Sequence, residues 1–383
     1  RMLKVWNLSL IIIAFGLTIF GTFLTRSGIL SSVHAFSSGP VGIVFLGFLA
    51  LIILGSFGLL AWRADRLRGQ PELDSMLSRE STFLLNNVVL VSALFTIFLG
   101  TVFPLLSEAV AGVKVSVGAP YFNRVTTPLF LGMVFLMGVG PLIAWRKASW
   151  DNLKRNFLWP ASLSLAAGLA LFSWKVGEFW LLLAFTLSVF VTLTIFFDTA
   201  RAVRARREIA GERLLGALAT LVRRNQRRYG GFIVHLGVVL IVLGIAGSMS
   251  GSVEREATLK AGEVLSIDRF SIRFDGLRAI EQPTHIRVEA LFSVSNDGRD
   301  LGVLVPALKY FPAQQSPIGR AVFRSTLTED LYLILSGFSE VRQGQATLKA
   351  LVRPLMAWIW LGGAVMTLGT IVALWPFRPR KAR

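Results

Sequence analysis

The sequence predicts an α-helical polytopic membrane protein with about eight transmembrane helices and a small β-rich domain outside the membrane. Hydrophobic residues make up 54% of the 383 residues and charged residues only 16%, whereas soluble globular proteins carry about 25% charged residues. The apolar residues form long uninterrupted blocks, and one later stretch of about a hundred residues alternates apolar and polar side chains instead. This pattern excludes an ordinary soluble enzyme.

Each predicted span is an apolar run with few charges that is long enough to cross a bilayer as a helix, which takes about 18 residues. The runs are 6–25, 41–62, 83–105, 128–145, 157–173, 178–198, 231–250 and 354–376.

Basic residues predict the orientation of these spans, because cytoplasmic loops collect Lys and Arg. With residues 1–5 in the cytoplasm, the loops on that side and the C-terminal tail hold 23 of the 40 Lys and Arg. The short outer loops carry only Arg26, Lys114, Arg124 and Lys175. Both termini are therefore expected on the cytoplasmic side, and this distribution explains the net charge of +18 without nucleic acid.

The chain divides into three parts. Residues 1–250 are expected to form a membrane domain with seven helices, 251–353 a β-rich domain on the outer side, and 354–383 the last helix with a basic tail. Asn296-Asp297-Gly298 predicts a hairpin turn inside the β-rich part. The basic segment 199–230 has apolar residues at helical spacing over 201–228, which predicts an interfacial helix against anionic lipid.

The chain has no cysteine. It cannot form a disulfide, a thiolate metal site or a thioether of its own, so thiol chemistry must belong to a partner. No Asp or Glu is expected inside a helix, since Glu108 and Glu178 flank the spans. Ion-coupled transporters place carboxylates near the membrane midplane, and this pattern therefore argues against ion-coupled transport.

The three histidines differ in their surroundings. His34 follows the first span and is either a loop residue or an axial ligand of a metal porphyrin, with Arg26 near enough to meet a propionate. His235 is about five residues, or about 7 Å, inside the seventh span. It is either a neutral histidine bonded to a neighbouring helix or a haem ligand, with Gly230, Gly231 and Gly237 permitting close approach of a helix or a flat ring. His285 is expected to be an ordinary surface residue that enters a strand.

A two-histidine haem at the depth of His235 needs a second imidazole at similar depth. His34 and His285 both lie outside the spans. The second ligand must therefore be a methionine or come from elsewhere in a longer sequence.

Several motifs in order along the chain closely resemble the cytochrome c-type biogenesis family CcmF, with its paralogue NrfE. They are 21–28 (GTFLTRSG), 31–36 (SSVHAF), 100–105 (GTVFPL), 117–123 (VGAPYFN), 138–142 (GVGPL), 229–237 (YGGFIVHLG) and 358–363 (WIWLGG).

The resemblance implies a cytochrome c haem lyase (holocytochrome c synthetase) of the bacterial inner membrane. In such proteins haem arrives from the chaperone CcmE at a periplasmic, Trp-rich WWD segment and is ligated by two periplasmic histidines. His34 matches the second of these and is the expected catalytic and haem-binding residue. A separate haem b lies in the membrane between two helix histidines, and His235 matches the second of those.

The family works with CcmH, which presents the reduced CxxCH apocytochrome c, and the haem vinyl groups then form thioethers with the two thiols. The WWD segment and the first histidine of each pair lie, in the family, upstream of the point matching residue 1. The chain is therefore expected to be the C-terminal portion, active only within the full-length protein and its complex. Arg26 and Arg124 are candidate partners of haem propionates; the alternative is that they anchor helix ends at the headgroups.

Two other functions remain open from the sequence. One is a non-catalytic scaffold that handles and transfers haem, and the other is a transporter of a hydrophobic substrate. Loss of thioether formation while haem binding persists in His34 variants would favour the enzyme.

Overall fold

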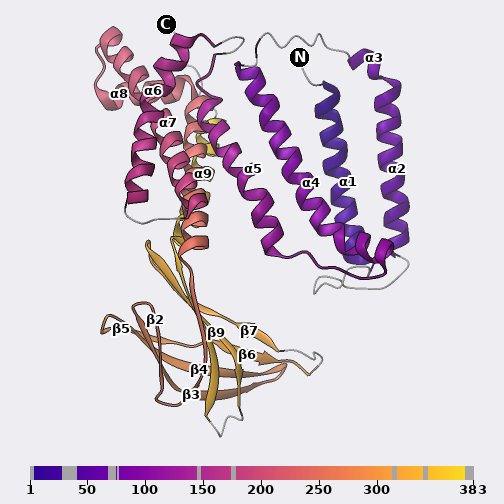
Figure 1. Cartoon of the computed structure of the whole chain (residues 1–383), viewed down its shortest axis with the longest axis vertical. Coiled ribbons are helices and arrows are strands. Elements are labelled where there is room, and N and C mark those ends of the chain that lie inside the picture. Colours follow the sequence, from indigo (N-terminus) through magenta and orange to yellow (C-terminus); the bar gives the residue numbers. More distant parts are fainter. Residues whose placement is uncertain are drawn as a thin grey trace. The chain divides into compact units, whose positions relative to one another are not determined.

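The structure is a computed structural model that describes residues 4–27, 41–67, 75, 77–144, 148–173, 178–312, 317–339 and 344–375 (Figure 1). Among these residues, eight helices are long and apolar enough to cross a membrane, as the sequence predicts. His34 and the basic tail after residue 375 lie outside the described residues. The chain forms two compact units, which are described separately.

The first unit comprises Arg1–Phe130 and Ala144–Ala148. It contains α1 (Lys4–Arg26), α2 (Val41–Trp62), the short α3 (Ala64–Leu67), α4 (Arg79–Ala111) and the beginning of α5 (Ala119–Val139). The Ser78 hydroxyl caps α4 by accepting from the Ser81 backbone N–H at 3.1 Å. Gly112 ends α4 with a positive φ of 67°, the usual left-handed stop.

The second unit contains the end of α5 and five further helices. These are α6 (Trp150–Ser173), α7 (Phe179–Ala210), α8 (Leu214–Arg224), α9 (Gln226–Gly251) and α10 (Met356–Leu374). Val134 of α5, Phe190 and Val191 of α7, and Val239 of α9 form a buried apolar cluster. Between α9 and α10 the described residues form ten strands.

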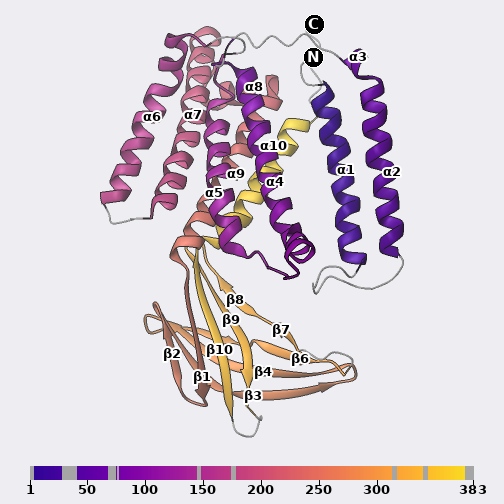
Figure 2. The same ribbon diagram turned by 45° about the vertical axis from the view of Figure 1, so that its right-hand side comes forward.

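Glycines set the contact between α9 and α10, which run side by side (Figure 2). A Cβ added at Gly237 would lie 2.5 Å from Met366 of α10, and one added at Gly369 would lie 2.6 Å from the Val234 backbone nitrogen. Gly230, Gly237 and Gly244 are seven residues apart and therefore share one face of α9. Small residues at this face let the two backbones approach closely, as is typical of membrane helices.

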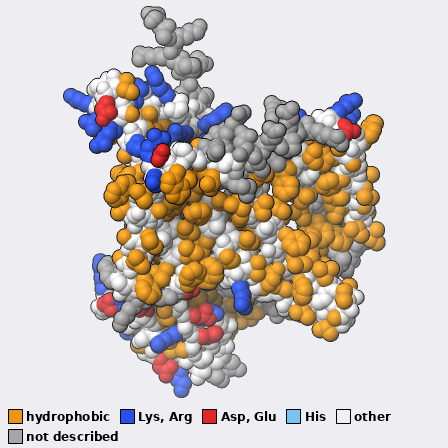
Figure 3. Space-filling model, turned by 45° about the horizontal axis from the view of Figure 1, so that its top comes forward, with side chains coloured by type: hydrophobic (Ala, Val, Ile, Leu, Met, Phe, Trp, Pro, Cys, Tyr) orange, Lys and Arg blue, Asp and Glu red, His pale blue; other side chains and the backbone are white. Residues whose placement is uncertain are grey.

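Large apolar side chains point outward from the membrane helices. Ile43 of α2 is 76% exposed and Trp360 of α10 is 78% exposed. Figure 3 shows hydrophobic side chains spread over the helices, with basic side chains gathered where α8 lies. Such exposure is favourable in lipid and confirms the membrane-protein class.

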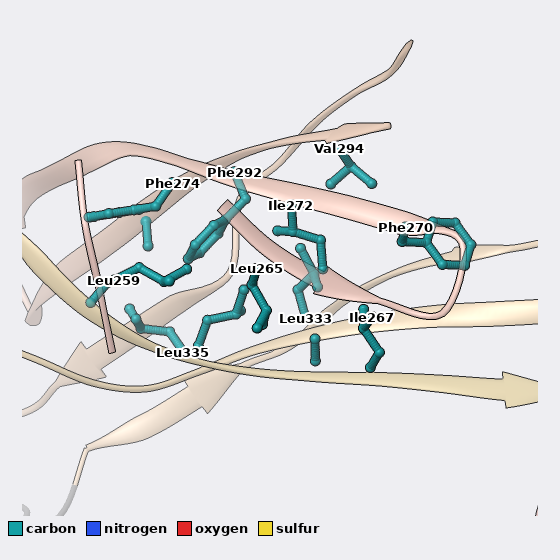
Figure 4. Close-up of a cluster of buried hydrophobic side chains, with 14 of the residues drawn as sticks. Leu259, Leu265, Ile267, Phe270, Ile272, Phe274, Phe292, Val294, Leu333 and Leu335 are labelled. Atoms are coloured by element: carbon teal, nitrogen blue, oxygen red, sulfur yellow. The ribbon is translucent and has the colours of Figure 1, made fainter. Parts of the chain in front are cut away.

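The strands form two antiparallel sheets that share one core. Their bounds are β1 (Val253–Lys260), β2 (Val264–Ile267), β3 (Phe270–Gln282), β4 (His285–Asn296), β5 (Arg299–Leu304), β6 (Ala307–Tyr310), β7 (Ile318–Arg320), β8 (Val322–Ser325), β9 (Glu329–Phe338) and β10 (Gln345–Pro354). One sheet has the order β1-β10-β9-β8, and the other has the order β2-β3-β4-β6-β7 with β5 also paired to β4. Phe274, Phe292 and Leu333 are fully buried between the sheets (Figure 4). Leu348 is fully buried in the same core.

The predicted hairpin is confirmed. Asn296 of β4 pairs with Arg299 of β5, so the loop holds only Asp297 and Gly298. Both have positive φ, 48° and 82°, which is the pattern of the type I′ turn that matches strand twist.

Two expectations about the helices are wrong. Helix α7 continues to Ala210, so Asp198 lies inside a helix rather than at its end, and Glu108 lies in the last turn of α4. The segment 201–228 is not one interfacial helix. It comprises the end of α7, the separate amphipathic helix α8 and the first residues of α9, because Gly211 stops α7 in the left-handed conformation.

Candidate functional site

His235 lies on α9, nine residues after Gln226 and therefore about 13 Å along the helix axis. The helix begins five residues earlier than the sequence predicts, which places the imidazole further from the helix end than expected. The side chain is half-buried, and its Nδ1 atom is buried with no hydrogen-bond partner among the described residues. A buried polar atom without a partner costs about 1–3 kcal/mol, so packing alone does not account for this imidazole.

The glycines around His235 belong to two different faces of α9. Gly230 and Gly237 face α10, where an added Cβ would lie 2.6 Å from Ala373 and 2.5 Å from Met366. Gly231 faces elsewhere, and a Cβ there would meet nothing within 4 Å. Since Gly231 is one turn before His235, the two residues share a face. Helix approach therefore explains Gly230 and Gly237, while the space beside His235 is open at Gly231.

Further along α9, the same face is packed. Val239 is one turn after His235 and lies in the buried cluster with Phe190 and Val191 of α7. Along this face of α9, the space beside Gly231 is therefore open, whereas Val239 is covered by other helices.

An ion pair that the sequence reasoning missed joins α7 and α9 at their basic ends. Arg228 donates to the Asp198 carboxylate at 2.6 Å, and Arg201 lies 3.8 Å from the same carboxylate. The Arg228 guanidinium also lies over the Phe232 ring, 5.6 Å from its centroid. The signal that could have found it is the helical spacing of apolar residues, which continues past Asp198 into the basic segment.

The other predicted site residues do not join this group. His34 is outside the described residues. Arg26 is the last residue of α1 and Arg124 lies near the start of α5, and both are exposed residues of the first unit. Within the described part of the chain, no group of three or more His, Cys, Asp or Glu residues could hold a metal ion.

His285 is not the ordinary surface residue that the sequence predicts. It begins β4 as expected, but its ring stacks on Phe311 with centroids 4.8 Å apart. Its Nδ1 lies 3.0 Å from the Thr284 hydroxyl and its Nε2 is buried. The side chain packs in the β-rich part.

Two of the sequence motifs meet in the first unit. Gly100 and Phe103 of one motif and Val117, Gly118 and Tyr121 of the other line an apolar cavity of about 440 Å³. The Tyr121 hydroxyl donates to the Thr96 carbonyl at 3.4 Å. These motifs therefore hold the end of α4 against the start of α5.

Comparisons with known proteins identify the family. A sequence profile described as the CcmF C-terminal beta-sandwich matches residues 250–354, the two sheets described above. The cytochrome c-type biogenesis protein CcmF of Pseudomonas aeruginosa is 35% identical over 97% of this chain, and that of Haemophilus influenzae is 32% identical over 98%. The chain belongs to the CcmF family.

A solved structure and a paralogue refine this assignment. The structure titled cytochrome c heme lyase CcmF matches 98% of the chain with a TM-score of 0.76 and 30% identity. The NrfE protein of Haemophilus influenzae is 24% identical over 99% of the chain, a lower identity than that of its CcmF. The chain spans 55% and 57% of the length of the two CcmF relatives and 55% of the solved CcmF chain.

Proposed function

We propose that the chain forms part of a cytochrome c haem lyase (holocytochrome c synthetase). The observation that carries this proposal is the similarity to the solved heme lyase CcmF, which extends over both the helices and the two sheets. The reaction adds each cysteine S–H of an apocytochrome across a vinyl C=C bond of the haem substrate. A C–S bond forms, the hydrogen goes to the other vinyl carbon, and no net oxidation occurs. A chain without cysteine suits this role, because it has no thiol of its own to compete.

His235 is the proposed axial ligand of a haem b held in the membrane. Two observations fit that group: a half-buried imidazole with one orphaned nitrogen, and the open space over Gly231 where a flat ring could lie. When bound, such a haem would supply electron transfer. His235 would hold it, and α7 and α5 close the same face of α9 beyond this site through Val239.

The haem substrate is proposed to bind at His34, on the outer side of the membrane. Arg26 ends the helix that leads to His34 and carries an exposed guanidinium suited to a propionate. Arg124 is the second proposed propionate partner, from the start of α5. The proposed partners are the haem chaperone CcmE, CcmH and apocytochrome c, together with membrane lipid; no nucleic acid is involved.

The proposed location is the bacterial inner membrane, with both termini in the cytoplasm and the β-sandwich of 251–353 in the periplasm. Support comes from the basic residues, since nine of the 40 Lys and Arg lie in 199–230 around α8. Residues 1–250 and 354–383 then form the membrane part, with α8 at the cytoplasmic surface.

The histidines can be tested separately in the full-length protein within its complex. His34→Ala is expected to abolish thioether formation while the membrane haem remains, and His235→Ala is expected to remove the membrane haem. His285→Gln is the matched control and should leave both unchanged. Thioether formation at the normal level in the His34 variant would contradict the proposed catalytic role.

Orientation can be tested by labelling introduced cysteines, because these 383 residues contribute none of their own. Val303→Cys places a thiol on the sandwich and Leu215→Cys places one on α8; the native side chains are 54% and 77% exposed. A membrane-impermeant maleimide added to intact spheroplasts should label only Val303→Cys. Labelling of only Leu215→Cys would reverse the proposed topology.

A further inference from the structure

Three residues of α9 form one stripe, and the haem lyase function proposed above assigns no role to one of them, Arg228. Each residue advances about 100° around a helix, so Arg228, Gly231 and His235 fall within about 60° of one another. Arg228 and His235 are seven residues apart, which is about 10 Å along the axis. A cation and an imidazole thus flank a stretch of helix that carries the Phe232 ring on one side and, at Gly231, no side chain on the other.

The open space lies on the Gly231 side of this stretch. Gly230 and Gly237 are closed by α10, whereas Gly231 has no atom within 4 Å of an added Cβ. A helix interior disfavours glycine by about 1 kcal/mol relative to alanine. The contact with α10 explains Gly230, and no contact among the described residues explains Gly231.

The geometry allows Arg228 to exchange its ion pair with Asp198 for one with another anion. Its side chain is 50% exposed, while that of its partner Asp198 is 13% exposed. Asp198 has a second cation, Arg201, at 3.8 Å, so it would keep a counter-charge if Arg228 turned toward another anion. The guanidinium is also supported by the Phe232 ring below it.

We propose that Arg228 and Gly231 form the propionate side of the membrane haem site, with Gly231 as the floor under the ring edge and Arg228 as the propionate partner. This inference rests on the proposed haem at His235. Arg228 would hold the propionate in the charge-assisted geometry that guanidinium and carboxylate favour. Asp198 then keeps Arg201 as its counter-charge.

The ion pair gives a test in which a structural role and a haem-binding role of Arg228 predict different effects on haem retention. In the full-length protein, Arg228→Gln removes a cation near the iron and should shift the midpoint potential of the membrane haem to more negative values. Asp198→Asn removes an anion and should shift it to more positive values. Loss of a charge-assisted hydrogen bond should also weaken haem retention by about tenfold or more in Arg228→Gln alone.

Arg227→Gln is the matched charge control, because Arg227 is exposed and lies about 100° away on the same helix. It should leave the potential and the haem retention at the native values. If Arg228 only ties α9 to α7, both variants should lose haem to the same extent or not at all. Equal haem retention in Arg228→Gln and Asp198→Asn, or an unchanged potential in both, would overturn the proposal.

The proposed position of Gly231 under the haem ring has a separate test. Gly231→Leu should fold normally, since the space around it is open, but should lower the haem content several-fold and alter the absorbance spectrum. Gly363→Leu on α10 is the control, because an added Cβ there also meets nothing within 4 Å. Native haem content in Gly231→Leu would overturn the floor assignment. If His235→Ala also retains its haem, the proposed membrane haem ligand itself is wrong; if His235→Ala loses it, only the present inference fails.

Discussion

The β-sandwich and the membrane helices of this chain use apolar side chains in opposite ways. In the sandwich, Phe274, Phe292 and Leu348 are fully buried between two sheets. In the helices, side chains of the same kind point outward, and Gly42 is the only residue of α2 that is buried. Contacts between α9 and α10 are made instead by glycines.

The difference follows from the two solvents. Water drives large apolar side chains into a shared core, whereas lipid solvates them as well as another helix does, so that helices associate through close backbone approach. A polar group inside a helix therefore needs its own explanation. His235 and the Asp198–Arg228 pair are such groups, and both lie on α7 and α9 away from the glycine contact.

The largest expected effect belongs to the sandwich core. Phe292→Ala removes a fully buried ring that packs 5.2 Å from Phe274, and should lower the free energy of unfolding of the sandwich by about 3–5 kcal/mol. Phe323→Ala, at a 60% exposed position, should change it far less. Thermal unfolding followed by sheet-specific hydrogen exchange in the full-length protein measures both, and equal losses would contradict the assigned core.

A smaller effect is expected at the helix contact. Gly237→Ala places a methyl group 2.5 Å from Met366 and 2.7 Å from the Gly362 carbonyl oxygen, and backbone atoms cannot move aside as a flexible side chain can. The free energy of unfolding should fall by about 1–3 kcal/mol. Gly363→Ala, with open surroundings, should be neutral or stabilising by up to about 1 kcal/mol. Denaturation in detergent would contradict the contact if both variants behaved alike.

The smallest effect concerns acid stability of the sandwich. Burial tends to raise the pKa of Asp275, but the hydrogen bonds from Ser293 and Arg273 outweigh it, and the pKa is lowered from its ordinary value. Because the folded state favours the carboxylate, its contribution is present above the ordinary aspartate pKa near 4 and is lost as the pH falls through the lower folded value. The pair with Arg273 is partly exposed, so the contribution is at most about 1 kcal/mol.

Asp275→Asn should therefore make the loss of stability below about pH 4 shallower while changing the helices little. Unfolding measured between pH 2 and pH 6 (about two units around that value) tests this. A steeper acid loss in the variant would show that the sign is wrong.

Much of the fold follows from the sequence because its signals are local. Long apolar runs fix the eight spans, and Asn296-Asp297-Gly298 fixes a turn whose two positive φ values suit those residues. The strand order is different in kind. The pairing of β1 with β10 joins residues about a hundred positions apart. Nothing in the sequence of either strand indicates which strand it pairs with.

The candidate site shows the same division. His235 stands out in the sequence because an ionisable side chain within an apolar run is rare. Asp198 does not stand out in the sequence, since it falls at the edge of its apolar run. Its importance becomes visible through its ion pair with Arg228, which joins α7 to α9. Gly230 and Gly237 contact α10, whereas Gly231 lies beside open space. This difference depends on the position of α10, which sequence spacing alone does not supply.

The most direct test of a haem held at His235 is the reduced-minus-oxidised absorbance spectrum of the purified full-length protein. His235→Ala is expected to lose the membrane haem signal while the protein stays folded, as checked by an unchanged unfolding profile of the sandwich. A full haem content with an unaltered spectrum in that variant would contradict the account.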